Sequence, residues 1–228
     1  MKQDTLNAST FAGLSTFNRQ ELFSVLECCI NIYNQFIVCG NKICNKENLI
    51  RDIFFEKLND DDYRNQHPCL QNFHFEKEPQ ENSGYLDIKV KTLNPYESAK
   101  SYYIIECKRL NSNNLTGDGG LNAEYIKNGI CRYVTGYYST YFNCNVMFGF
   151  VVESVNIQTD IIDKINSIIT KDYINKQHVT VNTNTIQKLT YEDFVSGYPY
   201  SYISKHEHMS GKEIVLYHLI LDFSKNIK

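Results

Sequence analysis

Apolar residues in the first quarter of the chain recur every three or four positions, which is the spacing of one face of an α-helix. The pattern runs from 19 to 38 and returns from 46 to 58. A Cys-Gly-Asn sequence at 39–41 separates the two runs. We therefore expect two helices in this part of the chain, preceded by a flexible polar arm over residues 1–18.

A strict alternation of apolar and polar residues, typical of a half-buried strand, follows in GYLDIKV, residues 84–90. It predicts that Leu86, Ile88 and Val90 share one face of a strand. SYYIIECKR, residues 101–109, predicts a second strand, and the Asn-Pro pair between the two stretches is typical of a turn. The two strands therefore form an antiparallel hairpin.

The remaining patterns complete a chain in which helices and strands are mixed. We expect a strand near 72–76, a helix over 122–138, a buried strand over 143–152, a helix with Ile157, Ile161, Ile165 and Ile168 on its apolar face, a short strand with a loop over 173–195, and a hairpin over 198–223 that turns at 209–211. This order predicts an α/β fold with a central mixed sheet flanked by helices. We expect one domain over 19–228.

The hairpin brings two carboxylates together. With its turn centred between residues 96 and 97, paired positions add up to 193, which sets Asp87 directly opposite Glu106. Two like charges about 5 Å apart destabilise a sheet, so they require compensation. Either Lys89 and Lys108 form a solvated ladder of ion pairs with them, or the carboxylates bind a divalent cation, which prefers oxygen ligands.

Composition narrows the class of protein. With 228 residues, 42% of them hydrophobic, the chain can bury a core, and its net charge of −3 gives no global attraction to nucleic acid. Lysines and one arginine nevertheless gather on or near the hairpin, as Lys89, Lys91, Lys100, Lys108 and Arg109. Any nucleic-acid binding must therefore be local.

The cysteines and the chain start favour a reduced, cytoplasmic protein. None of the eight cysteines forms a C-x-x-C pair, and Cys28, Cys29, Cys107 and Cys131 lie in apolar runs, where a free cysteine acts as a small core residue. The first residues lack the pattern of a signal peptide. The apolar stretch at 146–152 is too short for a bilayer span, so we expect no membrane association.

GYLDIKV and IIECKRL together resemble the PD-(D/E)xK, or restriction-endonuclease-like, nuclease superfamily. The resemblance lies in the ordered combination of Gly-x-x-Asp, a turn, and two apolar residues before Glu-x-Lys, and it extends over roughly 45–152. The proline that precedes the aspartate in the family is Leu86 here, a departure that removes no ligand. The resemblance implies an αβββαβ core, with an extra N-terminal helix and a C-terminal hairpin.

The resemblance also implies a catalytic metal site. Asp87 and Glu106 would hold Mg²⁺, with Mn²⁺ as a substitute, and the backbone carbonyl of Cys107 would be a further ligand. Lys108 would orient the attacking water, help to deprotonate it, or stabilise the charge that develops on the phosphate. Glu47 on the second helix matches the additional acidic ligand of the family, although a carboxylate in the first turn of a helix is also favourable by itself.

Other polar residues are weaker candidates. Asp52 and Glu56 compete with Glu47 on the same helix. Residues expected to contact the DNA phosphates or the active site are Lys89, Arg109, Tyr125, Lys127 and Arg132. His206 and His208 share a strand face, but no third metal ligand accompanies them.

The implied function is Mg²⁺-dependent endonuclease activity on DNA that leaves a 5′-phosphate, in restriction or in defence against foreign DNA. A nuclease of DNA repair or recombination is one alternative. The other is a non-catalytic module on the same fold that binds nucleic acid or protein, in which the hairpin charges are only ion pairs. A homodimer would suit double-strand cleavage, since one chain provides one active site.

Overall fold

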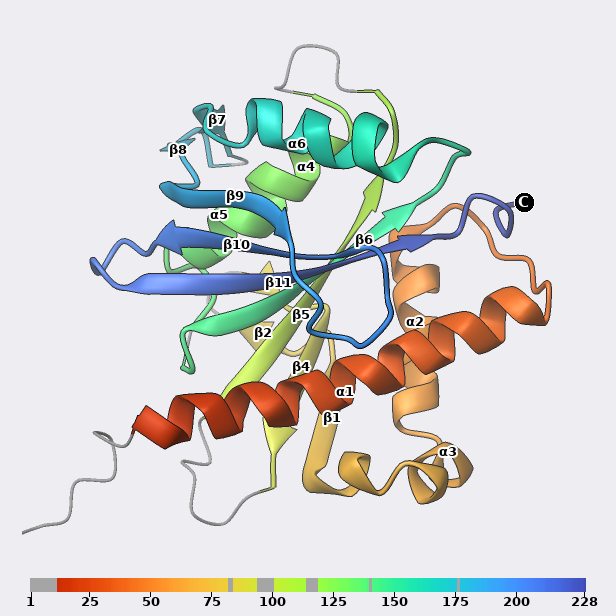
Figure 1. Ribbon diagram of the computed structural model, residues 1–228. Coiled ribbons are helices and arrows are strands. Elements are labelled where there is room, and N and C mark those ends of the chain that lie inside the picture. Colours follow the sequence, from red (N-terminus) through yellow and green to blue (C-terminus); the bar gives the residue numbers. More distant parts are fainter. Residues whose placement is uncertain (1–11, 82–83, 94–100, 114–118, 140, 176) are drawn as a thin grey trace, which may run out of the picture.

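The computed structural model describes residues 12–81, 84–93, 101–113, 119–139, 141–175 and 177–228. These residues form an α/β fold in which a seven-stranded mixed sheet carries helices on both faces (Figure 1). The strand order across the sheet is β1-β4-β5-β6-β11-β10-β9. Two further sheets have two strands each, β2-β3 and β7-β8.

The elements of the first half lead from two long helices into the sheet. Their bounds are α1 (Ala12–Val38), α2 (Glu47–Leu58), α3 (Asp61–Gln66), the 3-10 helix η2 (Pro68–Asn72), β1 (Phe73–Lys77), β2 (Gln80–Glu81), β3 (Gly84–Tyr85), β4 (Ile88–Thr92) and β5 (Tyr102–Leu110). Strand β1 confirms the strand expected near 72–76, and α2 confirms the second helix.

The second half alternates helices with the remaining strands. Its elements are α4 (Leu121–Tyr125), the π-helical segment η3 (Ile126–Ile130), α5 (Cys131–Val134), β6 (Cys144–Val151), the π-helical segment η4 (Ile157–Ile162), α6 (Asp163–Ile168), β7 (Tyr173–Ile174), β8 (Thr180–Val181), β9 (Thr185–Tyr191), β10 (Ser201–Glu207) and β11 (Glu213–Asp222). The hairpin of β10 and β11 is confirmed, and β11 continues the sheet by pairing in parallel with β6.

The register of the β4-β5 hairpin is the predicted one. Ile88 pairs with Ile105, and the pairs run on to Lys91 with Tyr102, so that each pair adds up to 193. The turn itself, at 94–100, lies outside the described residues. Strand β5 pairs in parallel with β6 on its other side.

Two apolar clusters occupy the two faces of the sheet. Helices α1 and α2 cover one face, where Phe54 packs on Phe148 and Phe150. Helices α4, α5 and α6 cover the other (Figure 1). Leu86 lies in this second cluster, whereas Ile88 lies in the first. The prediction that Leu86 shares a face with Ile88 and Val90 is therefore wrong, because the strand is interrupted between β3 and β4.

Helix ends account for further differences from the sequence-based expectations. The first helix begins at Ala12, so the arm expected over 1–18 is wrong for residues 12–18, and residues 1–11 lie outside the described residues. The helix expected over 122–138 ends at Val134. Short helix α3 was not predicted; the side chain of Asp60 caps it by accepting a hydrogen bond from the backbone N–H of Tyr63.

The cysteines in the apolar runs at 28–29, 107 and 131 are free and buried, as expected. No helix among the described residues is both long enough and apolar enough to cross a bilayer. The C-terminal region, the least informative part of the sequence, supplies three of the seven strands of the main sheet.

Candidate active site

The candidate site begins where β4 leaves β5. Their pairing ends at Ile105, and beyond it the backbone N–H groups on that side of β5 donate to carboxylates instead. The N–H of Cys107 donates to Asp87 Oδ2 at 2.8 Å, and the N–H of Arg109 donates to Glu47 Oε2 at 3.0 Å. Because buried backbone donors require partners, the open edge of β5 fixes both carboxylates beside it.

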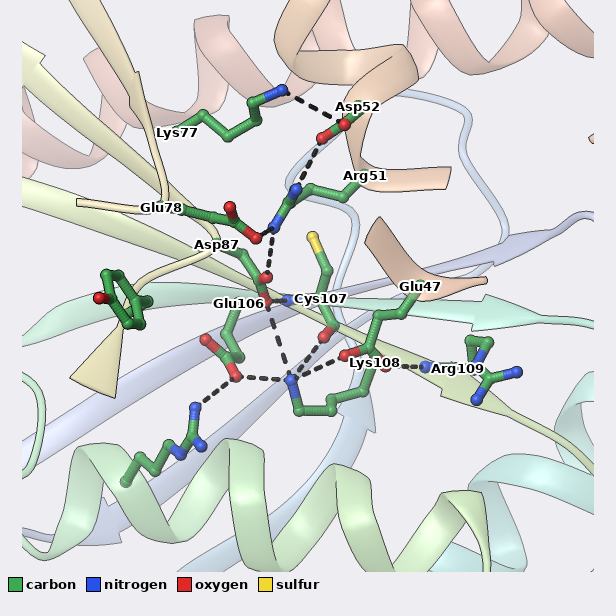
Figure 2. A network of polar contacts seen from close by, with 12 residues as sticks. Glu47, Arg51, Asp52, Lys77, Glu78, Asp87, Glu106, Cys107, Lys108 and Arg109 are labelled. Atoms are coloured by element: carbon green, nitrogen blue, oxygen red, sulfur yellow. Dashed lines mark hydrogen bonds and ion pairs between the residues drawn. The ribbon is translucent and has the colours of Figure 1, made fainter. Parts of the chain in front are cut away.

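The ammonium of Lys108 is the centre of this group (Figure 2). Its Nζ lies 2.6 Å from Glu106 Oε1, 2.7 Å from the carbonyl oxygen of Cys107, 3.3 Å from Glu47 Oε1 and 3.8 Å from Asp87 Oδ2. These are the four oxygen groups that the family resemblance implies as metal ligands. They come together around one cationic nitrogen.

Because Glu106 and Lys108 are buried, their pKa values are shifted from the usual ones. Glu106 is 1% exposed and Lys108 is 8% exposed. Burial raises the pKa of Glu106 to about 7, although the charges of Lys108 and Arg132 act in the opposite direction. Burial lowers the pKa of Lys108, but the carboxylates of Glu106, Asp87 and Glu47 outweigh it, so its pKa is raised overall. Strand β5 stays buried as far as Lys108.

Glu106 has two more partners on the face of the sheet that α4, α5 and α6 cover. Arg132 Nη1 lies 3.2 Å from its Oε1, and the hydroxyl of Tyr138 donates to its Oε2 at 2.8 Å. The helix carrying Arg132 ends at Val134, and Gly136, two residues on, has a φ of 68°, the left-handed conformation favoured just beyond helix ends. The N–H of Tyr138 then bonds back to the carbonyl of Arg132. This turn sets both side chains on Glu106.

Asp87 is held from its other side by Arg51 on α2. Arg51 Nη1 lies 3.2 Å from Asp87 Oδ1 and 2.8 Å from Glu78 Oε1, and the same guanidinium also binds Asp52. Sequence reasoning missed both Arg51 and Tyr138. The available signal for Arg51 was its position four residues after Glu47, which puts the two side chains on one helix face.

Two of the predicted substrate contacts line one cleft, and one of them contacts Glu106. Arg132 touches it directly, and Lys127 forms an ion pair with Glu124 at 2.9 Å. Both side chains line a small cleft together with Asn128, Tyr137 and others. Gly129 allows η3 to pack closely against β6, because a Cβ at this position would lie 2.4 Å from Met147 Cε.

The other three predicted substrate contacts lie apart from this cleft. The ammonium of Lys89 lies 3.8 Å from the ring centroid of Tyr102. Arg109 Nη1 donates to the carbonyl and side-chain oxygens of Asn45. Tyr125 is fully buried, and its hydroxyl is hydrogen-bonded to a histidine of β11, so this geometry gives it no contact with a ligand surface.

The other two acidic candidates on α2, Asp52 and Glu56, do not contact Lys108. Asp52 accepts hydrogen bonds from Arg51, and Lys77 lies 3.3 Å from its other oxygen. Glu56 lines a groove between α1 and α2, away from Lys108. Glu47 is thus the acidic residue of this helix that contacts Lys108.

The donor set fits a hard divalent cation, because three carboxylates and a backbone carbonyl are the ligands that Mg²⁺ and Mn²⁺ prefer. As the side chains of the described residues lie, no three His, Cys, Asp or Glu groups are arranged as a metal site, and the oxygens surround the lysine instead.

Comparisons with known proteins return no matching family model, no matching curated protein and no matching solved structure. Any function must therefore be inferred from the geometry of this chain.

Proposed function

We propose that this protein is a metal-dependent nuclease that hydrolyses phosphodiester bonds in DNA, on a restriction-endonuclease-like fold. The observation that carries the proposal is the convergence of Glu47, Asp87, Glu106 and the Cys107 carbonyl on one cationic position. The chain order of α2, β1, β4, β5, the α4–α5 helix and β6 also supports it, since this is the αβββαβ order that the resemblance implies.

The same four groups would hold Mg²⁺ or Mn²⁺. When bound, such an ion supplies a water of lowered pKa and neutralises the scissile phosphate. Strand β5 contributes rigidity, because Glu106 and Lys108 are two residues apart and share one face of a buried strand. Lys108, an ammonium with three donors, would orient the attacking water and donate to the phosphate oxygen on which negative charge develops.

Arg132 and Lys127, on the face that α4 and α5 cover, would bind phosphates next to the scissile bond. Arg132 contacts Glu106, and Lys127 lines the same cleft as Arg132. Such contacts position a nucleic-acid backbone without reading its sequence. The proposal therefore includes no base specificity.

A non-catalytic binding module is the second candidate. It is favoured by the short contact between Lys108 and Glu106, because the lysine already compensates the buried carboxylate. Against this reading, buried charges that are merely paired are often less stabilising than packed apolar residues. A cluster with three carboxylates around one lysine is better explained by chemistry than by stability.

A cleavage assay distinguishes the two. Purified protein is incubated with plasmid, linear duplex, single-stranded DNA and RNA, in Mg²⁺, in Mn²⁺ and with a chelator. We expect metal-dependent cleavage of DNA that Asp87→Ala and Lys108→Ala abolish. No cleavage by the wild type with any substrate, or equal cleavage by the wild type and both variants, would contradict the nuclease proposal.

A further inference from the structure

Helix α2 directs two charged side chains of opposite sign toward the candidate site. Glu47 and Arg51 are four residues apart, so they lie on the same helix face. Glu47 reaches Lys108 and the backbone N–H of Arg109, and Arg51 reaches Asp87 (Figure 2). The packing of α2 on the sheet therefore positions both Glu47, a proposed metal ligand, and Arg51, the partner of the proposed ligand Asp87.

Arg51 is an unusual residue for the buried face of a helix. It is 3% exposed, and Ile50, Phe54 and Leu58 are the other buried residues of α2. A guanidinium remains charged under all ordinary conditions, so its burial is tolerated only with close acidic partners. Arg51 has three: Asp52, Glu78 and Asp87.

These contacts join three separate segments of the chain. Asp52 belongs to α2 itself, Glu78 lies between β1 and β2, and Asp87 lies just before β4. Glu78 has a φ of 49°, which a residue other than glycine rarely adopts, and its N–H bonds to the carbonyl of Asp87. The backbone and the guanidinium thus hold Glu78 and Asp87 side by side.

The two oxygens of Asp87 consequently have different partners. Oδ1 lies on Arg51, whereas Oδ2 accepts from the N–H of Cys107 and faces Lys108 Nζ. A carboxylate held at both oxygens cannot rotate freely about its last bond. Without Arg51, only the contacts at Oδ2, with the N–H of Cys107 and the ammonium of Lys108, would orient it.

We propose that Arg51 is a positioning residue, which orients Asp87 so that Oδ2 faces the position where a divalent cation binds. This inference rests on the proposed function, because it presupposes a cation site at Lys108. Partners that orient a metal ligand typically change metal affinity by 10- to 100-fold when removed. We expect an effect of this size from the loss of Arg51.

Calorimetric titration of full-length protein with Mn²⁺ tests this inference without relying on activity. The variants are Arg51→Gln, Arg51→Lys and the matched control Asp52→Asn, which removes a neighbouring partner of Arg51 but leaves its contact with Asp87. We expect Mn²⁺ affinity to fall 10- to 100-fold in Arg51→Gln and less in Arg51→Lys. In Asp52→Asn it should stay within about threefold of the wild type. The Mn²⁺ concentration that gives half-maximal cleavage should shift by the same factor.

Equal affinities of the wild type and Arg51→Gln would overturn the inference while leaving the metal site intact. An equal loss in Arg51→Gln and Asp52→Asn would also overturn it, because the whole cluster rather than the Asp87 contact would then matter. If the wild type itself binds no Mn²⁺, the proposed function and this inference fall together. Should Arg51→Gln not fold, the double variant Arg51→Gln/Asp52→Asn, which removes one charge of each sign, is compared with Asp52→Asn, with the same expectations.

Discussion

Two groups of polar side chains gather around buried residues, one at Glu106 and Lys108 of β5 and one at His206 and His218 of β10 and β11, and they differ in charge. The Lys108 cluster consists of Glu47, Asp87, Glu106, Lys108 and their guanidinium partners. The histidine chain consists of Tyr125, His218, Ser204 and His206, and ends on the carbonyl of Thr183. The first consists of acidic and basic side chains, and the second consists of groups that are neutral near pH 7.

The histidine chain has one consistent arrangement of hydrogens. The carbonyl of Thr183 can only accept, so His206 Nδ1 donates to it and His206 Nε2 accepts from Ser204. Ser204 then accepts from His218 Nε2, which leaves His218 Nδ1 to accept from the hydroxyl of Tyr125. Each ring nitrogen and hydroxyl in the chain thus has a partner, as buried polar groups require.

The comparison separates a structural network from a candidate functional one. In the histidine chain, hydrogen bonds between neutral groups join β10, β11 and α4, and none of these groups is a cation that a metal ion could replace. In the Lys108 cluster, by contrast, several carboxylate oxygens surround one ammonium whose position another cation could take. Burial alone therefore does not distinguish the two groups; the charges of their members do.

The largest effect is expected from Lys108→Met. Removal of one partner of a buried ion pair costs about 3–5 kcal/mol, so the metal-free variant should unfold at markedly lower denaturant concentration. Because the competing ammonium is gone, its Mn²⁺ affinity should rise above that of the wild type, although cleavage is lost. Denaturant unfolding with and without Mn²⁺ checks both points. Unchanged stability and unchanged Mn²⁺ affinity would contradict the place given to Lys108.

Glu106→Gln keeps the size of the side chain and removes its charge. We expect the rate of DNA cleavage to fall by at least about 100-fold, the loss typical of one electrostatic contact to a transition state. The control is His206→Asn in the histidine chain, which should leave the cleavage rate of the folded protein unchanged. Comparable losses of activity in both variants would remove the distinction between the two networks.

The histidine chain should make stability depend on pH. Burial lowers the pKa of His206 to about 4, and burial together with the charge of His206 lowers the pKa of His218 well below its usual value. The unfolded chain therefore binds more protons between pH 6.5 and 4, and stability falls as pH drops through this window. His206 alone contributes roughly 3 kcal/mol.

Chemical denaturation at several pH values measures this dependence. The slope between pH 4 and 6.5 should be smaller in His206→Asn than in the wild type. Identical slopes in the wild type and the variant would show that folding does not shift the pKa of His206.

Ser204→Ala gives the smallest of these effects. It leaves His206 Nε2 without its donor and His218 Nε2 without its acceptor. An unsatisfied buried polar group costs about 1–3 kcal/mol, which should appear as a lower unfolding midpoint with normal metal-dependent cleavage. A stability equal to that of the wild type would mean that the chain is not joined through Ser204.

The sequence was informative where local periodicity decides the structure. The assumed position of the turn gave the right register for the pairs from Ile88–Ile105 to Lys91–Tyr102, whereas Asp87, one residue before this ladder, accepts a hydrogen bond from the backbone N–H of Cys107. Arg51 and Tyr138 were missed because their contacts depend on how α2 docks and on how the chain turns at Gly136. Spacing puts Arg51 on the helix face of Glu47, but the contact of Arg51 with Asp87 and that of Tyr138 with Glu106 are tertiary features.

The same limit applies to the histidines. A shared strand face made His206 and His208 a conceivable metal pair, but His206 is buried on Ser204 and Thr183 while His208 binds Ser210 near the surface. Alternation predicts which face a side chain is on. It does not predict which side chain of the neighbouring strand or loop will meet it there.

The central claim is that the carboxylates around Lys108 bind a divalent cation, and a calorimetric titration with Mn²⁺ of the wild type and Asp87→Asn tests it most directly. We predict one Mn²⁺ per chain in the wild type. In Asp87→Asn, which keeps the size of the side chain but loses its charge, the affinity should be at least tenfold lower. Absence of binding in the wild type, or equal affinity in both proteins, would contradict the account.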